Sequence, residues 1–254
     1  MRSAGAVRTY SIDESLQPRE RAALDSVAAQ FRGAALLDLG VGAGRTVKPL
    51  LEISSNYIGI DYSPEMIAAC QRRYPDVHFA LGDARHLSMV ADSTIGLAMF
   101  SCNGISMVGH EDRLKILREV YRTLRPGGAC VLTTYNQDSR DHTAGFQFPE
   151  FEFSSNPARL LVRAARFALA TANRTYNWCR HQRHAVRGSE YSIINDVCHD
   201  YGVMLYYISL ANQRRQLETC GFLPNAIAFD HGGREITAYN LENDFAIVAR
   251  KPFS

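Results

Sequence analysis

Short apolar runs alternate with amphipathic segments along residues 34–136 and again along residues 209–250. The apolar runs have the length of single buried strands, and the segments between them carry apolar side chains at helical spacing. We predict strands at 34–40, 56–61, 76–83, 93–102, 129–136, 223–230 and 244–251, and helices at 18–31, 44–53, 63–74, 110–124 and 211–222. This alternation predicts an α/β fold, in which a parallel sheet has helices on both faces.

The alternation is interrupted at residues 137–208, where a polar loop, an arginine-rich helical stretch and a tyrosine-rich stretch follow one another. No internal repeat or low-complexity linker separates this segment from the rest. We therefore predict a single domain over residues 1–254, with an N-terminal helical segment at 1–32 and an insertion at 137–208. The aromatic side chains of the insertion suit a lid over a small substrate: Tyr176, Trp178, Tyr191, Tyr201, Tyr206 and Tyr207.

The charge is nearly balanced overall but uneven along the chain. A net charge of +2 over 254 residues does not by itself indicate a polyanionic partner. Residues 153–189 nevertheless contain seven arginines and no acidic residue. Arginines at helical spacing lie opposite apolar side chains in the first part of this stretch, so we interpret it as an amphipathic helix with a solvated basic face. The alternatives are an anionic substrate and RNA.

Cysteine usage and hydropathy indicate the compartment. Six cysteines are scattered without a Cys-x-x-Cys pair, so we expect free thiols. Cys179, His181 and His184 lie close in sequence, but their spacing matches no common zinc site, and we expect no metal. No apolar run approaches the roughly 20 residues of a membrane span, and residues 1–20 lack the apolar core of a secretory signal. We expect a cytoplasmic protein with no membrane partner.

The stretch LLDLGVGAGRT, residues 36–46, places Gly40, Gly42 and Gly44 directly after a predicted buried strand. A glycine turn between a strand and a helix lets the backbone approach a ligand that any Cβ would exclude. A dinucleotide-binding turn would have its third glycine where this chain has Arg45. The carboxylate of Asp38, two residues before the first glycine, suits a cationic ligand better than a pyrophosphate.

Two further acidic residues end the next two predicted strands. Asp61 ends the second strand, where a carboxylate can accept from both hydroxyls of a ribose. Asp83 ends the third strand, where it can accept from an exocyclic amine such as that of adenine, with the backbone of Ala84 beside it. Tyr62 and Met66 are placed to sandwich a purine ring. Three acids at consecutive strand ends therefore predict a nucleoside site.

These motifs resemble those of the class I S-adenosylmethionine-dependent methyltransferases, in order over residues 34–136 and more loosely over 209–250. LDLGVGAGR is similar to their first motif, IGIDYSPEMI to their second and GDAR to their third, and LRPGG before the fifth strand is a further mark. The resemblance implies a Rossmann-like, seven-stranded, mostly parallel sheet with helices on both faces and an antiparallel last strand. It also implies S-adenosylmethionine as the cofactor.

The resemblance further implies a role for each matching residue. The three glycines would line the methionine part of the cofactor, with Asp38 near its amino group. Asp61 would hold the ribose, Asp83 the adenine amine, and Ser101 would face the methyl group. The predicted cofactor-binding residues are Asp38, Gly40, Gly42, Gly44, Arg45, Asp61, Tyr62, Met66, Asp83, Ala84, Arg85 and Ser101.

The residues that act on the methyl acceptor are less defined by the sequence. Methyl transfer from a sulfonium is an in-line displacement in which the cofactor carries the chemistry, so a general base is optional. Candidates for contact with the acceptor are Tyr10, Asn103, Tyr135 and His231. Asn136 ends the fifth predicted strand beside Tyr135, and His142, like His231, lies in a loop.

The chain is therefore predicted to be an enzyme that transfers a methyl group from S-adenosylmethionine to nitrogen, oxygen or sulfur of a small molecule. An RNA methyltransferase that uses the arginine-rich insertion is the alternative, disfavoured by the low net charge. Arg45 disfavours a nicotinamide-dependent oxidoreductase, and a non-catalytic cofactor sensor stays open. The sequence defines neither the acceptor nor the oligomeric state.

Overall fold

The computed structural model describes residues 15–143 and 145–253. The predicted acceptor contact Tyr10 and the start of the N-terminal segment lie outside the described residues. The helices of the described chain are α2 (Pro18–Ala28), α3 (Val47–Leu51), α4 (Pro64–Arg73), α5 (His110–Thr123), α6 (Pro157–Gln182) and α7 (Leu210–Thr219), with 3-10 turns η1 (Ala29–Phe31), η2 (Gly104–Met107), η3 (Arg140–Thr143) and η4 (Cys198–Tyr201). The strands are β1 (Leu36–Leu39), β2 (Tyr57–Asp61), β3 (Phe79–Leu81), β4 (Ile95–Phe100), β5 (Leu124–Asn136), β6 (Val186–Arg187), β7 (Tyr191–Asn195), β8 (Met204–Ile208), β9 (Ile227–Phe229), β10 (Glu235–Ile236) and β11 (Asp244–Arg250).

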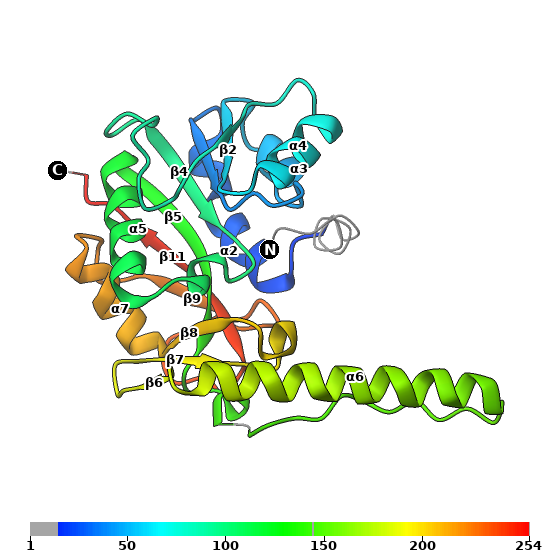
Figure 1. Ribbon diagram of the computed structural model, residues 1–254. Helices are drawn as coiled ribbons and strands as arrows, with labels where there is room; N and C mark the ends of the chain where they lie inside the picture. Colours follow the sequence, from blue (N-terminus) through cyan, green and yellow to red (C-terminus); the bar gives the residue numbers. More distant parts are fainter. Residues whose placement is uncertain (1–14, 144, 254) are drawn as a thin grey trace.

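The strands form one twisted sheet in the order β10-β9-β11-β5-β4-β1-β2-β3 (Figure 1). β1, β2, β3, β4 and β5 run parallel, while β11 runs antiparallel between β5 and β9. The predicted α/β, Rossmann-like fold with an antiparallel last strand is confirmed. The seven predicted strands are all present, but the sheet has 11, because β10 and three strands of the insertion join it.

Alternation of side chains along the central strands separates two hydrophobic clusters. Leu37 and Leu39 of β1 pack on one face with α5 and α7. Leu36 of β1 packs on the opposite face with α2, α3 and α4. Because side chains alternate with a period of two, Asp38 points to the same face as Leu36, beneath the helices that follow the glycine turn.

β5 begins at Leu124 rather than at the predicted Ala129. Its register with β4 shifts between Ile95 and Leu97, so the RPGG sequence forms an irregular start within the strand instead of preceding it. Such bulges bend a strand locally and increase its twist.

The insertion extends the same sheet. β8 pairs in parallel with the last residues of β5, Tyr135 and Asn136, and β7 and β6 continue outward from β8 as antiparallel strands. The predicted arginine-rich helix is present as α6, but none of its side chains is buried, and it projects from the body (Figure 1). Its apolar side is therefore not packed on the core. Within the described residues no helix combines the length and the apolar character that crossing a membrane requires.

Candidate active site

The glycine turn joins β1 to α3 at the carboxyl edge of the parallel strands. Gly40, Gly42 and Gly44 have φ of +63°, +57° and +90°, which side chains rarely tolerate. A Cβ on Gly40 would lie 2.8 Å from the ring of Phe100, and one on Gly44 would lie 3.0 Å from the ring of Tyr74. A Cβ on Gly42 would meet only the carbonyl oxygen of Gly40, at 3.9 Å, so glycine is favoured there by the backbone conformation alone.

Asp38 is fully buried beneath this turn. Its Oδ2 accepts hydrogen bonds from Thr46 Oγ1 at 2.5 Å and from the hydroxyl of Tyr57 at 2.8 Å. Its Oδ1 is buried and has no hydrogen-bond partner in the described part of the chain. Burial raises the pKa of Asp38 to about 7, although the two hydroxyl donors oppose the shift. A buried carboxylate with one unused oxygen is costly unless a donor arrives, so this atom fits a cationic amino group.

Asp61 connects the end of β2 to the glycine turn. Its Oδ2 accepts from the backbone N–H of Gly42 at 2.9 Å, and its Oδ1 accepts from the N–H of Ser63, also at 2.9 Å. Burial raises the pKa of Asp61, and the backbone donors oppose this. Asp38 and Asp61 thus converge on one turn, as the motif order predicts.

Asp83 is held differently from the other two acids. It is half-exposed after β3, and both of its oxygens accept from the guanidinium of Arg85 at 2.6–3.0 Å. Hydrogen bonding from Arg85 lowers the pKa of Asp83. Arg85 also bonds Asp112 at 2.6 Å. Arg85 is therefore a counter-ion to two carboxylates, and the contact of Asp83 with adenine stays a prediction.

The two residues expected to sandwich adenine have different exposure. Tyr62 is 61% exposed on the surface beside the glycine turn, whereas Met66 is 4% exposed in the first turn of α4. Ala84 is half-buried. Their contact with a purine also stays a prediction.

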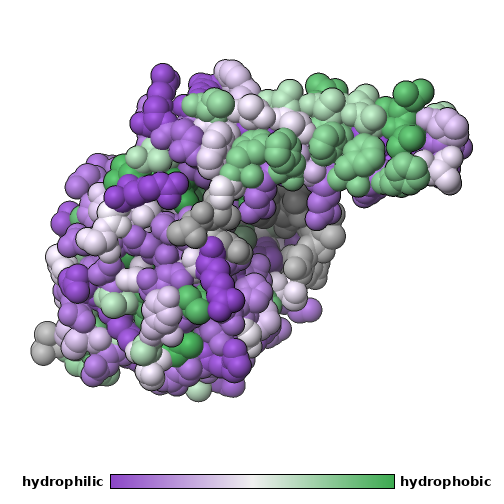
Figure 2. Space-filling view, turned by 90° about the horizontal axis from the view of Figure 1, so that it is seen from below, coloured by the Kyte–Doolittle hydropathy of each residue, from purple (hydrophilic) through white to green (hydrophobic). Residues whose placement is uncertain are grey.

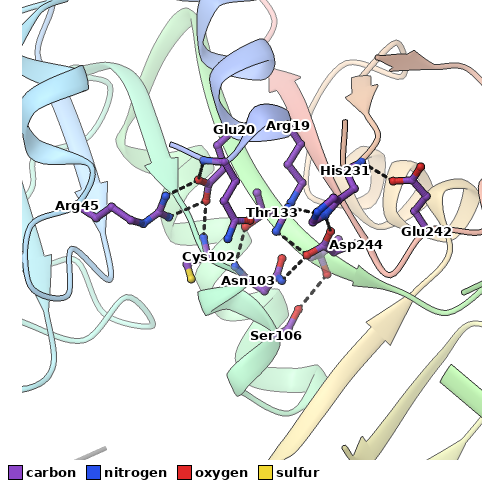
Figure 3. A network of polar contacts seen from close by, with 12 residues as sticks. Arg19, Glu20, Arg45, Cys102, Asn103, Ser106, Thr133, His231, Glu242 and Asp244 are labelled. Atoms are coloured by element: carbon purple, nitrogen blue, oxygen red, sulfur yellow. Dashed lines mark hydrogen bonds and ion pairs between the residues drawn. The ribbon is translucent and has the colours of Figure 1, made fainter. Parts of the chain in front are cut away.

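Arg45 forms an ion pair with the buried Glu20 that sequence reasoning missed. It reaches the carboxylate of Glu20 at 2.6 and 2.9 Å (Figure 3). Glu20 Oε1 also accepts from the N–H of Cys102 at 2.9 Å. Burial favours the neutral form of Glu20, but Arg45 and the backbone donors outweigh it and lower the pKa of Glu20. Glu20 therefore fixes the start of α2 to both the glycine turn and the end of β4.

The chain after β4 adopts an unusual backbone. Ser101 is buried, and Cys102 and Asn103, which follow it, both have φ of +53°. Non-glycine residues in this region are strained unless the surroundings hold them, and such strain gathers at functional sites. Here Asn103 donates its N–H to Thr133 Oγ1 at 2.7 Å and its amide to Asp244 Oδ2 at 3.1 Å.

Asp244 is the centre of a second polar group at this edge (Figure 3). Because β11 runs antiparallel, its first residue lies beside the carboxyl end of β5, opposite Tyr135. Asp244 pairs with the buried Arg19 at 2.5 Å, and its Oδ1 lies 3.2 Å from Nδ1 of His231. The predicted residues Asn103 and His231 are thus brought together through a carboxylate that the sequence analysis did not name.

Tyr135 lies at the junction with the insertion. Its ring stacks on Tyr207 of β8, with 5.2 Å between centroids. The ring of His142 lies 5.1 Å from that of Tyr207, and burial lowers the pKa of His142. Asn136, in contrast, donates its side-chain amide to the carbonyl oxygens of Asn240 and Glu242 and has a structural role. No cluster of three or more potential metal ligands occurs among the described residues.

Comparison with known protein families identifies the part of the chain that carries the glycine turn and the three acids. Residues 36–128 match the family model of the methyltransferase domain. Residues 36–128 therefore form a methyltransferase domain. The family predicted from the motifs is thereby confirmed.

Curated proteins with similar sequences are also methyltransferases. The chain is 32% identical over 104 residues to a demethylmenaquinone methyltransferase of Paenarthrobacter aurescens, covering 41% of this chain and 40% of that protein. The chain spans less than half the length of the first three curated relatives it matches.

Solved structures extend the likeness over the whole chain. The CcbJ methyltransferase from Streptomyces caelestis aligns with a TM-score of 0.63 at 17% identity, covering 98% of this chain and 96% of that one. A Burkholderia thailandensis 1,6-didemethyltoxoflavin-N1-methyltransferase, solved with bound 1,6-didemethyltoxoflavin and S-adenosylhomocysteine, aligns with a TM-score of 0.56 at 14% identity, covering 96% of this chain and 82% of that one. At these identities the structures show that the fold of the methyltransferase domain is shared.

Proposed function

We propose that the chain is an enzyme that binds S-adenosylmethionine at the glycine turn and transfers its methyl group to a small molecule. The observation that carries the proposal is the buried Asp38, whose unused Oδ1 lies beneath a turn of three glycines that Asp61 closes. A sequence relative is named for demethylmenaquinone and a structural neighbour for 1,6-didemethyltoxoflavin, and both are small molecules.

The residues present fit this cofactor. Asp38 Oδ1 would accept from its amino group, and the backbone of the three glycines would leave room for its methionine part. Asp61 and Asp83 would accept from the ribose and the adenine amine. When bound, the cofactor supplies a methyl group on a positively charged sulfur. The protein then needs to orient the acceptor and exclude water.

On the acceptor side, the proposed contacts are Asn103, Tyr135 and His231. Arg19 Nη1 and Asp244 Oδ1 lie 3.0 and 3.2 Å from Nδ1 of His231 and together hold its ring at this edge of the sheet. We assign the part of the insertion around β8 as the cover of this side, because β8 continues the sheet beside Tyr135. A cytoplasmic location accords with the five free thiols of the described chain.

A transfer assay tests the proposal against its RNA alternative. The protein is incubated with methyl-labelled S-adenosylmethionine and either a small-molecule extract or total RNA, with excess S-adenosylhomocysteine as the control. We expect label in the small-molecule fraction that the control suppresses. Label in RNA alone, or in neither fraction, would contradict the proposal.

A further inference from the structure

The feature that the proposed function leaves unused is the projecting part of the insertion, residues 145–182, here called the arm. The arm consists of an extended segment, residues 145–156, followed by α6, which is about 39 Å long. Its base is anchored, since Trp178 packs edge-on against Tyr201 at 4.9 Å and Arg174 pairs with Asp200 at 2.7 Å. The rest of the arm extends away from the sheet (Figure 1).

The arm exposes an unusual amount of apolar surface. Of the 15 exposed large hydrophobic side chains in the described residues, seven lie on it: Phe148, Phe151, Phe153, Leu161, Val162, Leu169 and Tyr176. Leu161 is 73% and Leu169 is 72% exposed. Figure 2 shows the hydrophobic side chains gathered along the projecting helix. Contiguous exposed apolar surface of this kind marks an interaction site.

The two sides of α6 differ in what they contact. One side packs on the extended segment, where Phe167 meets Phe151 with 5.4 Å between centroids and Arg163 donates to the carbonyl of Phe153 at 2.6 Å. At 100° per residue, the opposite side carries an apolar stripe that includes Leu161, Leu169 and Tyr176. This stripe is the unpartnered face.

Positive charge borders the unpartnered face. Arg159, Arg166 and Arg180 are exposed along its edge, and none forms an ion pair with a described residue. α6 contains no acidic residue along its 26 positions. The only acids of the arm are Glu150 and Glu152 of the extended segment, and Glu152 pairs with Arg163.

We propose that the unpartnered face of α6 docks on an anionic lipid bilayer, with the apolar stripe at the acyl boundary and the bordering arginines among the headgroups. An arginine-edged helix with a large apolar face, low net hydrophobicity and no acids is suited to lie in a membrane interface. A second copy of the chain is disfavoured because its α6 would bring the same unpaired arginines into contact. RNA is disfavoured because a duplex offers little for an apolar stripe to bind. The proposal departs from the expectation of no membrane partner, which considered only a spanning segment.

Vesicle sedimentation tests this surface independently of methyl transfer, since no cofactor is added. The full chain is mixed with phosphatidylglycerol–phosphatidylcholine vesicles or with phosphatidylcholine alone. We expect sedimentation with the anionic vesicles only, weakened by raised salt. Two double variants, Arg159→Glu with Arg166→Glu and Leu161→Asp with Leu169→Asp, should each lower the partition coefficient at least tenfold. The control is Arg72→Glu with Arg118→Glu, on exposed positions of α4 and α5, which should lower it less than twofold.

Every other outcome overturns the docking surface. Absence of vesicle binding, equal binding to neutral vesicles, or equal loss in the control would each do so. Retention on RNA without vesicle binding would reassign the face to nucleic acid, and a solution dimer that the leucine variants dissociate, again without vesicle binding, would reassign it to self-association. Circular dichroism of each variant confirms that the fold is retained.

Discussion

The carboxylate of Asp38 lowers the stability of the unliganded protein at neutral pH, and it is also the group proposed to bind the cofactor. Its folded pKa of about 7 lies above the unfolded value near 4, so the folded state binds more protons between these limits. The free energy of unfolding therefore falls as pH rises through this window. The protein retains an unfavourable buried carboxylate at neutral pH, which the proposed cofactor would neutralise.

The variant Asp38→Asn should remove this pH dependence in the unliganded protein. The wild type should lose stability between pH 5 and pH 8 and the variant should not. The difference in free energy of unfolding, variant minus wild type, should therefore grow by at least about 1 kcal/mol over this range. Urea denaturation at several pH values measures the difference. Asp76→Asn, at an exposed position, is the control. Parallel pH profiles for wild type and Asp38→Asn would contradict the assignment.

Gly40 tests the turn itself. Its φ of +63°, together with the 2.8 Å that would separate an added Cβ from the ring of Phe100, predicts that Gly40→Ala lowers the free energy of unfolding by about 2 kcal/mol. At Gly145, where a Cβ would meet nothing within 4 Å, the same substitution should change it by less than about 0.5 kcal/mol. Thermal denaturation compares the two, and equal effects would show that the turn does not require glycine.

At the scale of elements, the sequence did not predict the contacts of Glu20 with Arg45 and Cys102, which join α2 to the glycine turn and to the end of β4 and are here called the clamp. Glu20 is 0% exposed, and the side chain of its partner Arg45 is 14% exposed. The sequence shows Glu20 only as a charge in the first turn of a helix, where acids are common. Its burial follows from the way α2 crosses the ends of β1 and β4, which no local pattern specifies.

Removing one partner of this pair should be costly. Arg45→Met leaves the carboxylate of Glu20 buried without its counter-ion, so we expect a loss of about 3 kcal/mol in the free energy of unfolding. Arg21→Met removes an exposed partner of Asp25, 3.9 Å away, and should cost less than about 0.5 kcal/mol. Chemical denaturation distinguishes them. Similar losses would mean that the clamp does not stabilise the fold.

The insertion shows where element prediction fails and why. Strands 34–40 and 56–61 could be predicted because their apolar runs are buried on both faces. β6 is a two-residue exposed strand and β7 alternates buried with half-buried residues, so neither produces a clear apolar run. β8 lies within the tyrosine-rich stretch but joins the sheet through a pairing of only two residues with β5, which is set by tertiary structure.

For the molecule as a whole, the sequence predicted the fold and the convergence of Asp38 and Asp61 on the glycine turn. Both follow from strand ends that meet at one edge of a parallel sheet. The grouping of Asn103, Asp244 and His231 was not predictable in the same way. It depends on the antiparallel direction of β11, which places the first residue of that strand at the edge where the other strands end.

Isothermal titration with S-adenosylmethionine is the direct test of cofactor binding at the glycine turn. We expect a single site in the wild type, an affinity at least tenfold weaker in Asp38→Asn, and unchanged affinity in the control Asp76→Asn. The lost charge-assisted hydrogen bond, worth about 1.5–3 kcal/mol, sets that expectation. No binding at high micromolar cofactor, or equal affinity in wild type and Asp38→Asn, would contradict it.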